Sequence, residues 1–234
     1  MHISENIAII RDQINLATAR AGRKAEDIML MAVSKTFPAA SILAAYEAGI
    51  RAFGENRVQE FSQKAGALGD LDDVEWHMIG HLQSNKTAQA AEMFAAIDSL
   101  DSIKLAEKLN ASAEKLGKRL RVLLEIKVGG EASKSGLVPD SDELEQLLTS
   151  AARLDHLEFR GLMTIPPFSE DARESRPYFR HLCTLRDRIA ARRLPAVSMD
   201  VLSMGMSHDF EIAIEEGSTC VRIGTAIFGK RAKN

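Results

Sequence analysis

Lys35 is the residue of this sequence best placed to bond covalently with a carbonyl compound. It stands in the segment AVSKTFP (residues 32–38), directly after an apolar run, and Pro38 can open the next helix. If that run is a strand of a parallel barrel, the lysine lies at its carboxyl end, where such barrels bind their ligands. Partial desolvation there favours the neutral amine, which condenses with an aldehyde to an imine. A solvated lysine after a strand is the commoner case, so Lys35 alone defines no function.

A second segment, SMGMSHDFEIAIEEG (203–217), has the strand–turn–helix pattern of a phosphate site. We expect a strand to end at Gly205 and a helix to begin near Asp209, with Ser207 in the turn between them. Backbone N–H groups at a helix start attract phosphate, and the hydroxyl of Ser207 adds a donor. Ser207 would serve equally well as a helix cap, and the two roles are compatible.

The candidate last strand, CVRIGTAIFG (220–229), carries the third group of polar residues. Gly224 lets a ligand approach the backbone closely, and Thr225 supplies an N–H group and a hydroxyl. Arg222 alternates with apolar neighbours, so we expect its side chain to point into the barrel mouth. A guanidinium there needs an acceptor, because burying an unpaired charge is costly. A ligand and a neighbouring carboxylate both satisfy that need.

Three weaker candidates also fall where predicted strands end. They are Asn56 in FGENRVQE (53–60), His81 in IGHLQSNK (79–86) and Thr164 in GLMTIPP (161–167). Read singly, each is more often structural than functional, and they gain weight from their shared position at strand ends.

A metal site made of His77, His81 and Asp98 is the less favoured reading of the histidines. The two histidines would share a strand face only if the strand continued through Gly80. We therefore expect stacking or hydrogen bonding for His81 and no metal ligands in this chain.

The elements that must position these residues alternate regularly along the chain. The candidate strands are 29–34, 51–55, 75–80, 95–100, 121–128, 158–164, 198–205 and 220–229. The candidate helices are 57–69, 85–94, 101–117, 141–154, 170–193 and 209–217, with a further helix opening at Pro38 and an amphipathic pattern at 1–22. Eight apolar strands in β-then-α order predict a single (β/α)8 TIM-type barrel domain over residues 1–234, and a doubly wound open sheet is the rival fold.

Composition narrows the class of protein further. The formal net charge of −3 gives no sign of a nucleic-acid or membrane partner. The two cysteines, Cys183 and Cys220, lie far apart and suit a reducing cytosol. No apolar run approaches the roughly 18 residues that span a bilayer, and the amino-terminal pattern is not that of a signal peptide. We expect a cytoplasmic protein.

Taken together, the motifs resemble the pyridoxal phosphate homeostasis family of barrel proteins, which bind pyridoxal 5′-phosphate (PLP). The resemblance covers nearly the whole chain through the ordered segments AVSKTFP, RAFGENRVQE, WHMIGHLQSNK, SKSG, RGLMTI, LSMGMSHDFEIAIEEGST and VRIGTAIFG. It implies a barrel similar to that of bacterial alanine racemases (PLP fold type III), with PLP as the cofactor.

The resemblance also assigns roles to individual residues. It implies that Lys35 forms the Schiff base with PLP and that Arg222 faces the pyridine nitrogen, which keeps the ring a weak electron sink. The phosphate would be held by Ser207, Gly224 and Thr225, and three further residues would lie near the cofactor: Asn56, His81 and Met204. Two positions depart from the common pattern. Phe37 stands where a lysine is frequent, and Arg57 where an aromatic residue is frequent.

The choice between carrier and enzyme depends on a second base. A racemase needs one base on each face of a planar carbanion. In racemases similar to this barrel, the second base is a tyrosine of an additional β domain, which we do not expect in a chain that ends at Asn234. Tyr46 and Tyr178, the two tyrosines, fall in predicted helices away from the mouth. The resemblance therefore implies a PLP carrier that buffers the cofactor or delivers it to apo-enzymes, without racemase activity. Because we expect no second domain over the barrel mouth, we also expect an exposed cofactor and a monomer.

Two alternatives remain at this stage. One is a PLP-dependent enzyme acting on amino acids, in which SKSG (133–136) would close over the substrate. The other is an imine between Lys35 and a sugar or keto substrate, as in class I aldolases. Lys134 and Lys230 are further basic residues that could hold a second PLP, although surface solvation is the favoured reading.

Overall fold

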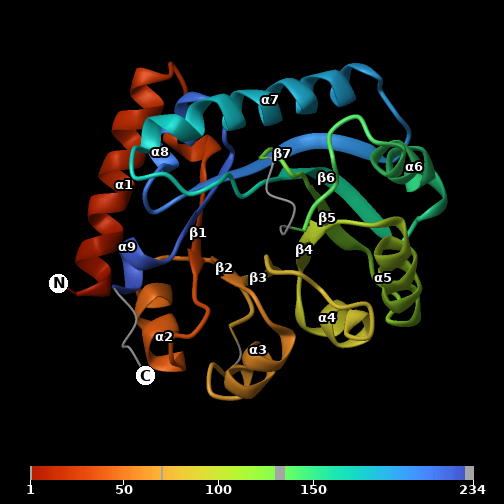
Figure 1. Ribbon diagram of the computed structural model, residues 1–234. Helices are drawn as coiled ribbons and strands as arrows, with labels where there is room; N and C mark the ends of the chain where they lie inside the picture. The colour runs from red at the N-terminus through yellow and green to blue at the C-terminus, as the bar shows by residue number, and fades with distance from the viewer. Residues whose placement is uncertain (1, 70, 130–134, 230–234) are drawn as a thin grey trace.

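Eight parallel strands close in chain order into a barrel (Figure 1), which confirms the predicted (β/α)8 fold. The computed structural model describes residues 2–69, 71–129 and 135–229. The strands are β1 Met29–Val33, β2 Ala52–Glu55, β3 Glu75–Met78, β4 Ala96–Leu100, β5 Leu120–Glu125, β6 Leu157–Met163, β7 Val197–Met206 and β8 Cys220–Ile223. Because β8 pairs with β1, no strand edge stays open, and the rival open sheet is excluded.

The helices form a ring outside the barrel (Figure 1). In the described part of the chain they are α1 Ile3–Arg20, α2 Ala39–Glu47, α3 Val58–Ala65, α4 Thr87–Met93, α5 Ile103–Lys115, α6 Asp142–Ser150, α7 Arg176–Ala191, α8 Phe210–Glu215 and α9 Thr225–Phe228. Short 3-10 turns lie at Ala25–Asp27, Ala151–Arg153 and Ala172–Ser175. Helix α1 precedes the first strand and packs against α8 and α9. None of the described helices is long and apolar enough to cross a membrane.

The near-continuous apolar runs of the strands follow from burial on both faces. One face of each strand packs under the helices, in a core that includes Ile97, Val122, Phe159, Leu202 and Val221. The other face fills the barrel interior, where a smaller cluster contains Met31, Val33, Ala52, Ile79 and Cys220. A strand with no wet face gains nothing from alternating polar residues, so the period-two pattern is lost.

The barrel interior also holds a charged pair. The Nδ1 atom of His77 lies 3.2 Å from both carboxylate oxygens of Asp98, and both side chains are buried. The Nε2 atom of the same ring lies 3.6 Å from Glu75, which in turn pairs with Arg121. Burial by itself lowers the pKa of His77, but the two carboxylates outweigh it and raise the pKa to about 9. The imidazole is therefore charged at neutral pH.

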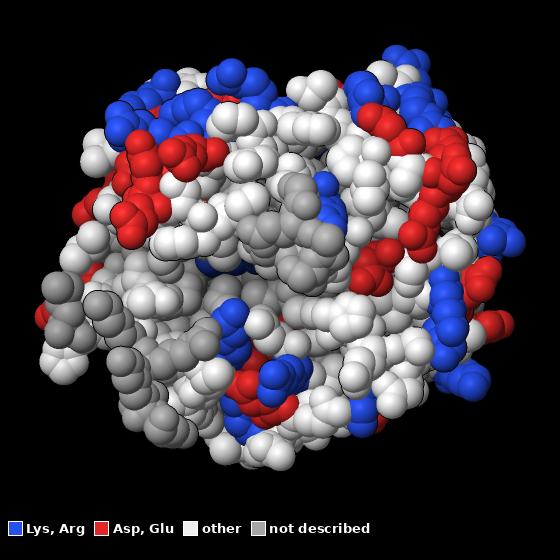
Figure 2. Space-filling view, in the orientation of Figure 1, with Lys and Arg blue, Asp and Glu red and all other residues white. Residues whose placement is uncertain are grey.

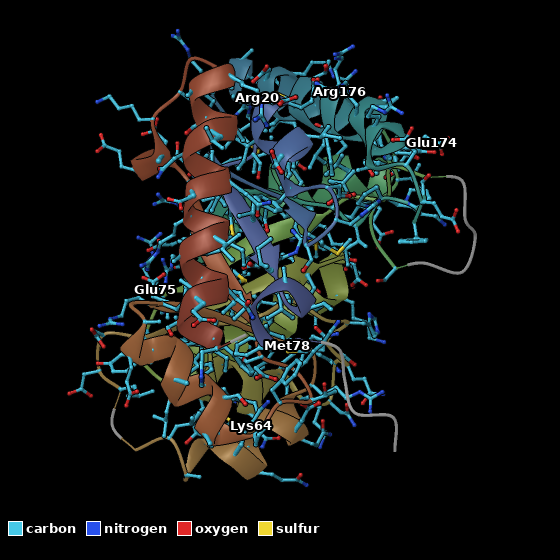
Figure 3. All side chains as sticks on the ribbon, turned by 90° about the vertical axis from the view of Figure 1, so that its left-hand side faces the viewer. Arg20, Lys64, Glu75, Met78, Glu174 and Arg176 are labelled. Carbon is cyan, nitrogen blue, oxygen red and sulfur yellow. The ribbon has the colours of Figure 1, made fainter. Side chains whose placement is uncertain are left out.

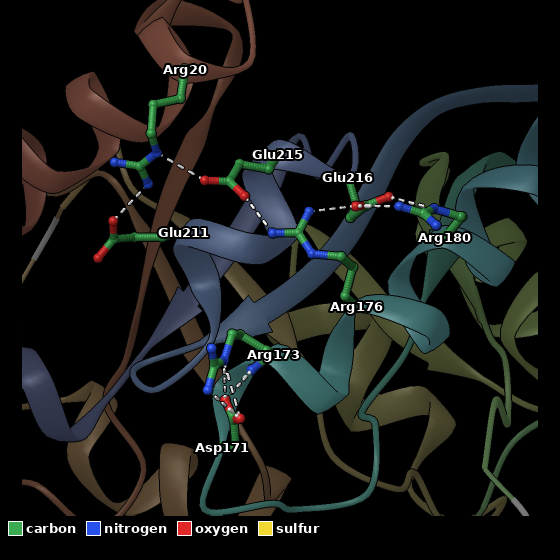
Figure 4. Close-up of polar contacts among 8 residues, drawn as sticks. All are labelled: Arg20, Asp171, Arg173, Arg176, Arg180, Glu211, Glu215 and Glu216. Carbon is green, nitrogen blue, oxygen red and sulfur yellow. Dashed lines mark hydrogen bonds and ion pairs between the residues drawn. The ribbon is translucent and has the colours of Figure 1, made fainter.

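A chain of ion pairs fastens α1 to α8 and α7 on the outside (Figure 4). Arg20 of α1 lies 2.9 Å from Glu215, which lies 2.6 Å from Arg176. Arg176 and Arg180 share Glu216, at 2.6 and 3.1 Å. Figure 2 shows basic and acidic side chains side by side in this upper part of the molecule. These groups are exposed or partly exposed at the surface, so each pair contributes only about 0–1 kcal/mol.

The predicted last strand, 220–229, is too long. Strand β8 ends at Ile223, and the carbonyl of Gly224 accepts from the N–H groups of Ile227 and Phe228, which starts α9. The apolar residues after Gly224 pack outside the barrel, where Asn6 of α1 donates to the Ile227 carbonyl at 2.8 Å. An apolar run of this length does not by itself distinguish a strand from a buried helix turn. The predicted helix 170–193 likewise divides into the turn Ala172–Ser175 and α7.

Candidate functional site

The carboxyl ends of the strands bring most of the predicted site residues to one mouth of the barrel. Lys35 follows β1, Asn56 follows β2, Ser207 follows β7, and Gly224 with Thr225 follows β8. All eight strands are parallel, so these ends face the same way, toward the end where TIM barrels place their active sites.

The turn after β7 faces the first turn of α9. Ser207 Oγ accepts a hydrogen bond from the N–H of Ala226 at 3.2 Å. Asp209, a buried carboxylate, fixes the turn by accepting from the Met206 N–H at 2.7 Å and from Ser175 Oγ at 3.0 Å. At Gly205, with φ of +95°, a Cβ would lie 2.5 Å from the Cβ of Ala213, so only glycine fits. The hydroxyl and N–H groups expected to bind phosphate therefore lie together.

Neither packing among the described residues nor the backbone conformation requires glycine at position 224. Its φ is −110°, outside the left-handed region. A Cβ there would meet nothing nearer than Val33, at 3.5 Å, which is ordinary contact. Packing within the described chain therefore accepts a side chain at this position, and close approach of a ligand is the remaining physical reason for glycine.

Arg222 is 3% exposed and points into the barrel, on the inward face of β8 with Cys220. Its Nη1 donates to Ser203 Oγ and its Nη2 to the Thr164 carbonyl, both at 2.7 Å. Burial lowers the pKa of this guanidinium. The sequence left two acceptors open for Arg222, a ligand and a neighbouring carboxylate. Among the described residues both hydrogen-bond partners are neutral, so a carboxylate does not fill this role.

The turn that carries Lys35 lies against α9. The ring of Phe37 stacks on that of Phe228, with 4.8 Å between centroids. Phe37 is the position where the resembled family often has lysine, and here it joins the Lys35 turn to the segment that carries Thr225. Lys35 itself is partly buried.

Asn56 and His81 occupy neighbouring loops with different exposure. A Cβ on Gly80 would lie 2.4 Å from the Asn56 carbonyl oxygen, so the loops after β2 and β3 touch through their backbones. Asn56 is partly buried, whereas His81 is exposed and its Nδ1 lies 3.2 Å from Asp101. The exposed Arg57 leads into α3. His77 and His81 thus have separate carboxylate partners, and no cluster that could hold a metal occurs among the described residues.

Two predicted residues support the mouth without lining it by their side chains. Met204 is fully buried in the core under the helices, and its carbonyl accepts from Ser218 Oγ at 2.8 Å. Its side chain faces away from the barrel interior because it lies one residue out of phase with Ser203. Thr164 is also fully buried, with its hydroxyl donating to the Ile126 carbonyl at 2.7 Å.

Three charged residues near the mouth were not identified from the sequence. Glu55 ends β2 and is fully buried, and Lys64 of α3 lies 2.8 Å from it. Glu125 ends β5 and lies 3.3 Å from Ser135 Oγ, and burial raises its pKa. A carboxylate at the end of an apolar strand run was the signal available for both glutamates. Of the segment SKSG, residues 133 and 134 lie outside the described residues, as does Lys230.

Comparison with known proteins places this geometry in a family. Residues 6–232 match the family model "Alanine racemase, N-terminal domain". The chain is 45% identical over 231 residues to the pyridoxal phosphate homeostasis protein of Aquifex aeolicus, covering 99% of each chain.

Solved structures agree in fold, and one of them also in length. PipY of Synechococcus elongatus, solved with PLP bound, is 38% identical, covers 97% of this chain and 100% of its own, and superposes with a TM-score of 0.86. An alanine racemase of Clostridium difficile is 15% identical, and this chain covers 58% of it with a TM-score of 0.70, a likeness of fold alone. The chain therefore belongs to the pyridoxal phosphate homeostasis protein family.

Proposed function

We propose that this protein binds PLP through a Schiff base on Lys35 and serves PLP homeostasis as a carrier without racemase activity. The observation that carries the proposal is the meeting, at one barrel mouth, of the Lys35 turn with Ser207, Gly224 and the first turn of α9. A relative of the same length and fold, PipY, holds PLP. When bound, PLP supplies an aldehyde that an amine can capture and a ring that withdraws electrons.

The phosphate would lie between the turn after β7 and the start of α9. Ser207 and Thr225 bring hydroxyl groups, and the backbone N–H groups around them are the donors a dianion prefers. Gly224 has no side chain to exclude the phosphate, which accounts for a glycine that internal packing does not require. Asp209 keeps the turn in shape through its two hydrogen bonds.

Arg222 would hold the ring from inside the barrel. A guanidinium only donates hydrogen bonds, so a pyridine nitrogen facing it must be the unprotonated acceptor. An unprotonated ring withdraws electrons weakly, so it stabilises a carbanion less than a protonated ring would. Asn56 and His81, in the touching loops after β2 and β3, would contact the cofactor from the opposite side.

The positions of the tyrosines favour a carrier over a racemase. Tyr46 lies on α2 with its ring 4.1 Å from the Arg51 guanidinium, before β2 begins and thus away from the mouth. Tyr178 lies on α7, outside the barrel. Neither Tyr46 nor Tyr178 is therefore placed to act as the second base on the face opposite Lys35.

The finer features of the proposal are a cytoplasmic monomer of one domain over residues 1–234, which passes PLP to apo-enzymes. Its near-balanced charge of −3 suits transient contact with many partners rather than attachment to anionic surfaces. Light scattering checks the monomer, and a mass near twice 25.7 kDa would contradict it.

The anchor is tested by absorbance and peptide mapping. Wild-type protein mixed with PLP should show the visible band of a PLP imine, borohydride should bleach it, and mass spectrometry should place the reduced adduct on Lys35. Lys35→Ala should lack the band. Lys24→Ala, which removes a lysine whose side chain is 76% exposed, should keep it. A band that survives Lys35→Ala would reject the assignment.

Activity is tested separately on the loaded protein. We expect no racemisation of alanine and no exchange of its Cα hydrogen with solvent deuterium. Turnover of any amino acid would favour the alternative, a PLP-dependent enzyme of racemase type.

A further inference from the structure

The Lys35 turn is held by an ammonium group from a different βα unit. Lys64 projects from α3 (Figure 3). Its side chain is only 11% exposed. Its Nζ lies 3.1 Å from the Ser34 carbonyl and 3.5 Å from the Phe37 carbonyl, the residues on either side of Lys35 and Thr36. One largely buried cation therefore joins both ends of the turn.

Two carboxylates complete the contacts of Lys64. Glu55 Oε1 lies 2.8 Å from Nζ and also accepts from Ser34 Oγ at 2.6 Å. Glu60 Oε1 lies 3.3 Å from Nζ and accepts from the N–H of Thr36. Each carboxylate thus binds both Lys64 and the turn. We call Glu55, Glu60 and Lys64 the turn clamp.

The turn has a backbone shape that needs such support. Thr36 has φ of +66°, in the left-handed region that a β-branched residue rarely adopts. Strained conformations of this kind persist where surrounding contacts over-determine them, and they cluster at functional sites. Here the Thr36 N–H is bound by Glu60, and the carbonyls that flank the strained residue are bound by Lys64.

The turn clamp also costs desolvation free energy, because it buries charged groups, and this cost is high for a purely structural role. Glu55 is fully buried, and its Oε2 has no hydrogen-bond partner among the described residues. Burial raises the pKa of Glu55, while Lys64 and Ser34 act against that rise. A buried ion pair with an orphaned oxygen gives little net stability compared with apolar packing, whereas it fixes geometry well.

We infer that Lys64, with Glu55 and Glu60, is a positioning residue that holds the Lys35 turn in the geometry in which its amine meets the PLP aldehyde. This inference rests on the proposed function. Lys64 acts through the backbone of residues 34–37 and has no assigned contact with the cofactor. Its loss should therefore weaken capture of the aldehyde and spare the sites that hold the phosphate and the ring.

The experiment compares two ligands that differ at one atom group. PLP carries the aldehyde, and pyridoxine 5′-phosphate carries an alcohol in its place, so it cannot form the imine. Affinities are measured by calorimetry for wild type, Lys64→Met and the matched control Lys118→Met. Lys118 is a partly buried lysine that donates to the Phe94 carbonyl at 3.3 Å, just before β5 and away from the mouth.

Lys64→Met should lose PLP affinity by on the order of ten- to a hundredfold, the effect of a small misplacement of a reacting group. Its affinity for pyridoxine 5′-phosphate should change less than about twofold, and Lys118→Met should change neither. Equal losses for both ligands would mean that Lys64 merely supports the fold, and no loss would mean that it does nothing for Lys35. Either result overturns the inference.

A second pair of variants guards against misfolding of Lys64→Met. Glu60 is partly exposed, so its replacement leaves no fully buried charge unpaired. Glu60→Ala should lower PLP affinity selectively and speed amide exchange at Thr36, whereas Glu60→Gln, which keeps an acceptor, should restore both. Failure of Glu60→Gln to differ from Glu60→Ala would count against the clamp. A wild-type protein without the imine band, even with a responsive Thr36 amide, would instead reject the proposed Schiff base and with it this role.

Discussion

The two sides of the barrel mouth are built by different means. On the β7–β8 side, a hydroxyl, a glycine and the first turn of a short helix meet, and the contact between Ser207 and the Ala226 N–H holds them together. On the β1–β2 side, an ion pair between the largely buried Lys64 and the fully buried Glu55 holds the turn of Lys35. The first side uses backbone donors, and the second uses side-chain charge.

The difference follows from what each side must hold. A phosphate is a diffuse dianion, and several N–H donors bind it from a modest range of positions. A lysine amine that attacks an aldehyde needs a narrow geometry, so the backbone beneath it must be fixed. When one of several hydrogen-bond donors to a phosphate is removed, the affinity for the phosphate falls only a little. A buried ion left without its partner, in contrast, costs several kcal/mol of folding free energy. The two sides should therefore respond very differently to substitution.

The largest effect on stability is expected on the ionic side. Lys64→Met should lower the free energy of unfolding by about 3–5 kcal/mol, because Glu55 is left buried without its counter-ion. The double variant with Glu55→Gln should recover most of the loss, since the amide still accepts from Ser34. Urea denaturation measures both. Equal stability of the single and double variants would show that the ion pair is not the source.

The charged pair inside the barrel should make stability depend on alkaline pH. His77 has a pKa raised from 6.5 to about 9, a difference worth roughly 3 kcal/mol. A raised pKa in the folded state means that this contribution is complete below about 6.5 and is lost as the pH rises through about 9. Denaturation across this range should show the loss in wild type and not in His77→Phe. A flat wild-type profile would contradict the pairing.

On the backbone side, the expected effect is on ligand affinity rather than on folding. Gly224→Ala should weaken binding of PLP by about 1–3 kcal/mol, since its methyl group would occupy the space where the phosphate approaches. The melting temperature should change little, because a Cβ there meets only Val33 at 3.5 Å. Pyridoxal, which has no phosphate, is the matched ligand. Equal weakening of pyridoxal would place the phosphate elsewhere.

Ser207→Ala should have the smallest effect of the series. It removes one hydroxyl from a site with several donors, worth about 1 kcal/mol in PLP affinity. Inorganic phosphate competing with PLP should lose affinity in parallel. A hundredfold loss would mean that the hydroxyl, and not the backbone, dominates phosphate binding.

The same contrast explains which parts of the site could be predicted from sequence. Ser207, Gly224 and Thr225 lie in short continuous motifs, where strand, turn and helix start are close along the chain. Lys35 could be identified in the same way. Lys64 could not, because it lies 30 residues from the Ser34 carbonyl that it binds and reads as an ordinary residue of an amphipathic helix.

Errors in the fold prediction have a related cause. The run 220–229 is apolar enough for a strand throughout, yet the chain leaves the sheet after Ile223 and packs as α9 beside α1. Met204 is a site prediction that remains to be tested; the alternation of β7 turns its side chain into the core under the helices. The apolar composition of a segment predicts that its residues are buried. It does not predict the direction in which their side chains point.

The eight alternating units, the parallel barrel and the strand ends that form the mouth could be predicted from the chain alone, because these depend on local periodicity and on a topology that puts all carboxyl ends together. The contacts between residues of different βα units depend on the folded structure. The register of β8 beside β1 brought Phe37 onto Phe228, and the packing of α3 brought Lys64 under the Lys35 turn. Those contacts join residues far apart in the chain, and barrel closure, not local pattern, sets which of them meet.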